Sequence, residues 1–363
     1  MLLIIFSLVG LAGNFFCSSP LKPAIMGLFN TVKPMMLYWC LCQYDFSWED
    51  FYHLMKRFTS LFYIIIASYL LDLFIPSFRS FIGYPKLETR LGIRTLGGLF
   101  AKQTNGNAWA IIYFIYYRYY APQTKKWKYM ASAAMVFVSI KVKDIFGFLA
   151  GLFVGYFKKV RLFYAVILAP TAMVLFYLYM IFMPQHYASY FGNMNDNSQT
   201  ARIALTNTSF KIAKDKFPLG VGYGQFASPM SRDYKSNVYK EYRINKVWGL
   251  TNTKGAANFM CDTFWPMILG ETGVIGLICY LCLLYMAFSP FLRAYFEDTS
   301  DRNVLFPSLV FVMYLVMTVA KPVFTGPPHS FVFWGFAGIF YSLYKKKFTM
   351  YVSRSQHRLR NKA

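Results

Sequence analysis

Acidic residues, histidine and paired cysteine are all scarce in this sequence, and each shortage excludes a class of protein. Only 15 Asp and Glu stand against 38 Lys and Arg. The four histidines are far apart and show no ligand spacing, which argues against a metal site. Most of the six cysteines lie in apolar runs, so a disulfide framework is excluded. The sequence also lacks internal repeats and low-complexity segments, which indicates one domain, residues 1–363.

Apolar residues are abundant. The chain is 56% hydrophobic and 20% aromatic, with a mean hydropathy of +0.36. Its apolar runs approach the roughly 20 residues that cross a bilayer as a helix, so we expect an all-α integral membrane protein of about ten spans. The opening stretch lacks a basic segment before its apolar run, which favours a first span over a cleaved signal. The expected spans are 2–17, 24–43, 58–77, 99–120, 127–140, 142–157, 160–183, 264–288, 304–322 and 329–344.

The net charge of +23 is spread over several loops between these spans, which argues against nucleic-acid binding. Basic short loops mark the cytoplasmic side of a membrane protein. The segments 125–128 and 158–161 and the basic tail 345–363 then share the cytoplasmic side, and both termini lie inside. The outer side receives 78–98, the turn around Lys143 and a large loop, 184–263, between spans seven and eight. A loop of that length is usually functional.

The large loop contains the letters Val-Gly-Tyr-Gly, as in a potassium-channel selectivity filter. A filter lies between closely flanking spans, whereas here the flanks are polar, so a channel is excluded. Apolar residues at helical spacing, Ile203, Phe210, Ala213 and Phe217, predict an amphipathic helix before it. Pro218 ends that helix. Three glycines then let the backbone approach another segment closely: Gly220, Gly222 and Gly224.

The order of motifs resembles the O-antigen ligase/polymerase family, bacterial enzymes that transfer lipid-linked glycans. An arginine, Arg202, is followed by a helix, the segment "PLGVGYGQF" and a polar stretch. A span then carries "LGETGVIG", residues 269–276. Looser similarities lie at 94–108, "RTLGGLFAKQTNGNA", and at 138–151, where this chain has Lys143 in place of the family's arginine.

This resemblance implies a multi-span glycosyltransferase fold in the bacterial inner membrane, with no cofactor or metal and with inversion at the anomeric carbon. The enzyme would polymerise repeat units of a surface polysaccharide at the outer face. Donor and acceptor would be glycans on polyprenyl pyrophosphate, and a chain-length regulator and a repeat-unit flippase are further candidate partners.

Cations would stabilise the departing pyrophosphate. The resemblance selects Arg94 and Arg202, with Lys143 as a substitute that lacks the bidentate fork of arginine. Arg232 is a further candidate on the outer loop, followed by Lys141 and Arg90. Each of these residues also has an alternative role without chemistry, as an interfacial anchor, a turn residue or a solvated side chain.

A carboxylate near the acceptor sugar would serve as general base. Ligases of the family carry His-Asn where this chain has Asp262 and Thr263, a departure that favours a polymerase. Asp262 is the first candidate base, with a helix N-terminal cap as its alternative. Glu271 lies deeper in the span and is expected to bond within the bundle and orient the site. Asp196 is a third candidate.

Two alternatives stay open. A ligase of the same family would pass the glycan to lipid A core or to a protein. A transporter of an anionic lipid-linked sugar would concentrate its charges near the bilayer midplane, in broken helices and internal repeats.

Overall fold

The computed structural model describes residues 1–84, 89–90, 92–121, 123, 125–156, 201–251, 258–297, 302–319 and 321–360. The protein is mostly helical. The expected span 160–183, the beginning of the large loop and Asp196 lie outside the described residues. The described chain forms two compact units, which are treated separately below.

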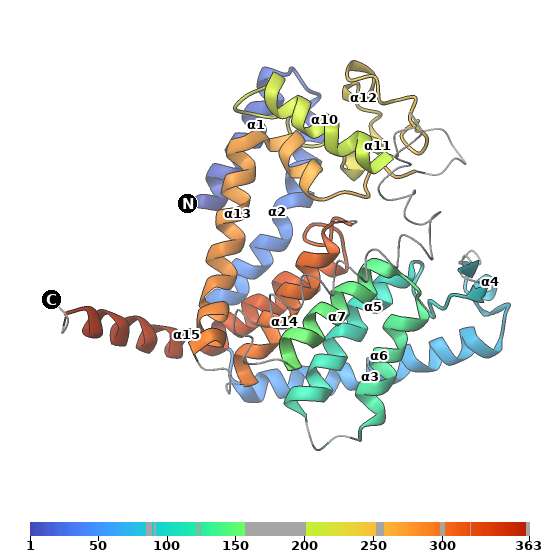
Figure 1. Ribbon diagram of the computed structural model, residues 1–363, viewed down its shortest axis with the longest axis vertical. Helices are drawn as coiled ribbons and strands as arrows, with labels where there is room; N and C mark the ends of the chain where they lie inside the picture. The colour runs from blue at the N-terminus through green and yellow to red at the C-terminus, as the bar shows by residue number, and fades with distance from the viewer. Residues whose placement is uncertain are drawn as a thin grey trace, which may run out of the picture. The chain divides into compact units, whose positions relative to one another are not determined.

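The first unit contains Met1–Lys33, Phe157–Met286 and Thr318–Thr325. Its helices are α1 (Leu2–Phe16), the beginning of α2 (Leu21–Gln43), α10 (Ala201–Asp215), α11 (Pro229–Asp233), α12 (Val238–Glu241) and most of α13 (Trp265–Glu297) (Figure 1). Four aromatic rings form its core: Phe6 contacts Tyr223 and Tyr280 at centroid distances of 6.0 and 5.5 Å, and Phe264 contacts Tyr280 at 5.3 Å. These edge-on contacts join α1, α13 and the loop after α10.

The second unit contains Pro34–Tyr156, Ala287–Met317 and Gly326–Ala363. Its main helices are α3 (Trp48–Phe74), α5 (Gln103–Ile115), α6 (Trp127–Val138), α7 (Val142–Tyr156), α14 (Arg302–Met317) and α15 (His329–Arg360). The shorter elements are α4 (Phe78–Phe81), the π-helix η1 (Tyr116–Tyr120) and an antiparallel pair of two-residue strands, β1 (Thr89–Arg90) and β2 (Ile93–Arg94). Within this unit α14 packs against α7, and α5 packs against α6 (Figure 1).

Sequence signals explain where these helices begin and end. Ser47 and Asp50 form a capping box at the start of α3, in which each side chain accepts a hydrogen bond from the other residue's backbone N–H. Ser228 and Ser231 form a second capping box at α11. Pro20 follows the end of α1, where the Ser18-Ser19 turn separates it from α2.

Each expected span in the described part of the chain coincides with a helix. Two of these helical segments, Trp48–Phe74 and Trp265–Leu292, are long and apolar enough to cross a membrane by length and composition. The last helix, α15, continues to Arg360 and therefore includes most of the basic segment that was expected to follow it as a tail.

Candidate functional site

The glycine-rich loop and the Leu-Gly-Glu-x-Gly segment, found separately in the sequence, bind each other in the first unit. The N–H groups of Val221 and Gly222 donate to the carbonyl oxygens of Gly270 and Glu271, both at 2.9 Å. These carbonyls can accept from the loop because α13 is interrupted at Gly273, where φ is 66° and ψ is −165°. That backbone conformation is open almost only to glycine. The expected close approach of backbone is confirmed at Gly220, where a Cβ would lie 2.2 Å from the Gly270 oxygen.

The Glu271 side chain strengthens the same attachment. It is buried and accepts a hydrogen bond from the Phe226 N–H at 3.2 Å. The Ser228 side chain and the N–H groups of Gly224 and Gln225 also contact its carboxylate. This ring of donors compensates for the burial of a carboxylate. Glu271 is therefore held in a closed cradle in this structure, in agreement with the expectation that it bonds within the bundle.

The other face of the loop packs against α1 and α2. Asn14 makes a paired contact with Tyr223: its amide donates to the Tyr223 carbonyl at 2.9 Å, and its side-chain oxygen accepts from the Tyr223 N–H at 2.8 Å. Small residues make room for the loop, since a Cβ on Gly13 would lie 2.9 Å from the Gly220 oxygen, and one on Gly27 2.5 Å from the Gly224 nitrogen. Sequence reasoning missed these residues. The available signal was Asn14, a polar side chain within an apolar helix.

Arg202 and Asp262 form an ion pair across this unit. One guanidinium nitrogen of Arg202 lies 2.8 Å from a carboxylate oxygen of Asp262. The side chains are 18% and 34% exposed, so the pair is accessible from solvent yet partly shielded. Helix α13 begins at Trp265, three residues after Asp262, so Asp262 is not its N-terminal cap. The expected Arg202 cation and the expected Asp262 carboxylate therefore belong to one cluster.

An apolar groove of about 330 Å³ lies between α10 and α13. Thr206 on α10 lines it, and its hydroxyl donates to the Arg202 carbonyl one turn earlier. Trp265 and Leu269 of α13 line the opposite wall.

Helix α10 differs from its expected amphipathic pattern. Phe210 and Phe217 were expected in its apolar stripe, but they are 63% and 70% exposed. Ala213 is buried as expected, and the buried face also carries Ala204, Leu205 and Ile212. Small side chains on that face permit close packing, while Phe210 lines the apolar groove. The helix ends at Asp215, close to the expected end before Pro218.

Arg94 lies in the second unit and has a carboxylate partner of its own. Its guanidinium lies 2.6 Å from Asp72, which is fully buried and also accepts from the N–H groups of Gly97 and Gly98. Arg79, also buried, donates to the carbonyls of Gly98, Phe100 and Ala101. Burial lowers the pKa of Arg79 from its ordinary value. The segment from Arg94 to Ala101 is therefore fixed by one buried carboxylate and two arginines.

The remaining sequence candidates are more dispersed. Lys143 is half-buried in the first turn of α7, in the second unit, next to Asp144, which accepts a 2.6 Å hydrogen bond from Asn107. Arg232 is 41% exposed in α11 and donates to its neighbour Asp233 at 2.7 Å. This hydrogen bond raises the pKa of Arg232. Among the described residues, no group of three or more His, Cys, Asp or Glu side chains is arranged to hold a metal ion.

Comparison with known proteins adds no identification: no protein-family model matches this chain, and no curated protein matches it.

Proposed function

We propose that this protein is a membrane glycosyltransferase that polymerises polyprenyl-pyrophosphate-linked repeat units of a surface polysaccharide at the outer face of the bacterial inner membrane. The observation that carries the proposal is the Arg202–Asp262 pair, with Arg202 one helical turn from Thr206 in the lining of an apolar groove. A lipid pyrophosphate donor requires a cation and an apolar groove, and a sugar hydroxyl acceptor requires a carboxylate.

In the proposed reaction a hydroxyl oxygen of the acceptor glycan attacks the anomeric carbon of the donor. The bond from that carbon to the pyrophosphate oxygen breaks, and the pyrophosphate leaves with the electron pair. Asp262 takes the hydroxyl proton, and Arg202 stabilises the charge that develops on the leaving group. A part of the isoprenoid chain lies in the apolar groove. Glu271 positions the glycine-rich loop and does not touch the reacting atoms.

Exposed apolar side chains support the membrane location. On α13 these include Ile278, Tyr285 and Met286, which are 55%, 61% and 62% exposed. On α1 they include Ile4 and Leu8, at 63% and 59%. Extended apolar surface of this kind is costly in water and is favourable against lipid.

The interruption of α13 at Gly273 is the observation that favours a transporter, because transporters bind substrates and ions at broken helices. In this protein, however, the carbonyls of Gly270 and Glu271 already accept hydrogen bonds from the loop. The break therefore serves an attachment within the first unit, which favours the transferase. A ligase of the same family would use the same donor, and transfer to lipid A core would identify it.

The test is the length of the surface glycan made by cells that depend on this chain. Arg202→Ala should leave the protein in the membrane but reduce the glycan to single repeats, since losing one charge-stabilising group typically lowers a rate by about 10²–10³-fold. Arg202→Lys should retain part of the activity. Lys211→Ala removes an exposed cation from the same helix and should have no effect.

Arg94→Ala is also expected to give single repeats. Because Arg94 pairs with the buried Asp72, the stability of this variant must be measured together with its glycan length. Removing Arg94 leaves a buried carboxylate with one partner fewer. Full-length polymer from both Arg202→Ala and Arg94→Ala would refute the pyrophosphate-binding role.

A further inference from the structure

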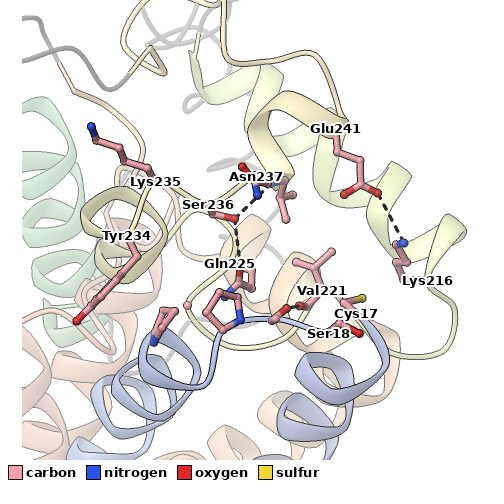
Figure 2. Close-up of a pocket in the computed structure, with 15 residues that line it drawn as sticks. Cys17, Ser18, Lys216, Val221, Gln225, Tyr234, Lys235, Ser236, Asn237 and Glu241 are labelled. Atoms are coloured by element: carbon pink, nitrogen blue, oxygen red, sulfur yellow. Dashed lines mark hydrogen bonds and ion pairs between the residues drawn. The ribbon is translucent and has the colours of Figure 1, made fainter.

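A second pocket in the first unit lies at the opposite end of α10 from Arg202. Its volume is about 270 Å³. It is formed by the turn between α1 and α2, the residue after α10, the glycine-rich loop and the segment from Tyr234 to Glu241 (Figure 2). Arg202 stands near the beginning of α10 and Lys216 just after its end, so about 20 Å of helix separates the two sites.

Gln225 places a buried side-chain amide, whose nitrogen has no hydrogen-bond partner in the described part of the chain, at the wall of this pocket. The side chain lines the pocket and is only 6% exposed. Its side-chain oxygen accepts from the Ser236 hydroxyl at 3.2 Å. Its amide nitrogen is buried and has no hydrogen-bond partner among the described residues. A buried donor without a partner is unfavourable, and an oxygen atom of a ligand would satisfy it.

The rest of the lining mixes polar and apolar groups, and it carries two lysines, Lys216 and Lys235, against one acidic residue, Glu241. Lys216 and Glu241 pair at 3.6 Å on one side of the pocket (Figure 2). Glu241 offsets the charge of Lys216, which makes an inorganic anion less favourable at that lysine. Ser18 and Asn237 add a hydroxyl and an amide to the lining.

Tyr234 contributes an aromatic ring on the other side of the pocket (Figure 2). The ring is fixed by two contacts: its hydroxyl lies 3.2 Å from the Met26 sulfur, and the Lys22 ammonium lies 5.8 Å from its centroid. Amide and hydroxyl groups beside an aromatic ring suit a ligand that has many hydroxyls and an apolar C–H face, as a pyranose does. The volume is below the roughly 300–1,000 Å³ typical of pockets for drug-sized ligands, which fits a single ring.

We propose that this pocket binds one sugar residue of a glycan, with Gln225 donating to a sugar oxygen and Tyr234 contacting the ring. The site is separate from Arg202 and Asp262, and the inference does not depend on glycosyl transfer at that pair. The pocket would be a separate glycan-binding site, on the part of the first unit that the glycine-rich loop, α11 and α12 form.

The experiment is ligand-observed NMR titration of the full-length protein in a detergent without a sugar headgroup. The probes are methyl glycosides of galactose, N-acetylglucosamine and glucuronic acid, with inorganic phosphate as the anion probe. At least one glycoside should bind saturably. Tyr234→Ala and Gln225→Glu should each weaken its binding by about tenfold, the order expected for losing one good contact.

Tyr234→Phe keeps the ring and is the matched control, with binding expected to stay within about twofold. Arg202→Ala should leave sugar binding unchanged, which separates this proposal from the proposed function. Tyr234 is partly exposed, so its variants remain informative even if Gln225→Glu does not fold. Absence of saturable binding by all three glycosides overturns the proposal. Phosphate binding without sugar binding, or sugar binding that is insensitive to Tyr234→Ala, also overturns it.

Discussion

Glycine at Gly273 combines two constraints that can be separated by experiment. Its φ is 66°, and an added Cβ would lie 2.4 Å from the Leu219 carbonyl carbon and 2.5 Å from the Pro218 oxygen. Gly83 has a similar φ of 78° but no atom within 4 Å of the same position. Gly83 therefore bears the backbone constraint alone.

We expect Gly273→Ala to destabilise the protein strongly and Gly83→Ala only slightly. The positive φ costs about 1–2 kcal/mol at Gly83, whereas the conformation at Gly273 is open almost only to glycine, and the contact with loop backbone adds to that cost. Thermal unfolding of the purified protein measures the difference. Equal melting temperatures for the two variants would mean that the loop is not packed on α13 as described.

Arg202 and Arg94 show how far the contacts of a single residue can be predicted from the sequence. Arg202 and Arg94 were both selected as cations, and each is paired with a carboxylate of its own unit. The partners stand 60 and 22 positions away in the sequence. Neither spacing matches a local helix or turn contact, so the pairing could not be predicted.

At the scale of elements, an interrupted helix and a loop stabilise each other. Helix α13 loses regular hydrogen bonds at Gly273, and the loop supplies donors to the carbonyls of Gly270 and Glu271. The Glu271 carboxylate adds a further contact with the loop, because it accepts a hydrogen bond from the Phe226 N–H. The loop is thus an integral part of the helical packing of the first unit.

Glu271→Leu should loosen the loop, because it leaves buried N–H groups without an acceptor, at about 1–3 kcal/mol for each. Glu271→Gln keeps one acceptor oxygen and should give an intermediate effect. Trypsin cleavage at Arg232 and Lys235 reports the loosening, with the wild-type protein as reference. Glycan polymerisation should fall in proportion to cleavage. A Glu271→Gln protein with a wild-type cleavage rate and no activity would instead make Glu271 a reacting group.

At the scale of the whole molecule, the proposed function requires the first unit's loop to lie outside the cell. The turn between α1 and α2 contacts the glycine-rich loop, since the Ser19 hydroxyl donates to the Val221 carbonyl at 3.2 Å. Alternating basic loops predict that both segments lie on the outer side. Their contact agrees with that arrangement.

A cysteine placed at Ser236 in a variant without native cysteines should react with an impermeant maleimide added to intact cells. A cysteine at Lys345, in α15, should react only after the cells are opened. The two variants serve as controls for each other. Labelling of position 236 only in opened cells would contradict the proposed function, because a donor lipid exposed on the outer face could not reach Arg202.

The sequence by itself determined where the long helices of the described chain lie, because long apolar runs and the proline and glycine residues that end them are local features of the sequence. It also identified the glycine-rich loop and the Leu-Gly-Glu-x-Gly segment, since glycine there answers a local need for close backbone approach. Only the tertiary structure decided that these segments bind each other, that α10 buries Leu205 and Ile212 but leaves Phe210 exposed, and which carboxylate each arginine meets. Those outcomes depend on packing between parts of the chain that are far apart in the sequence, so residue spacing could not predict them.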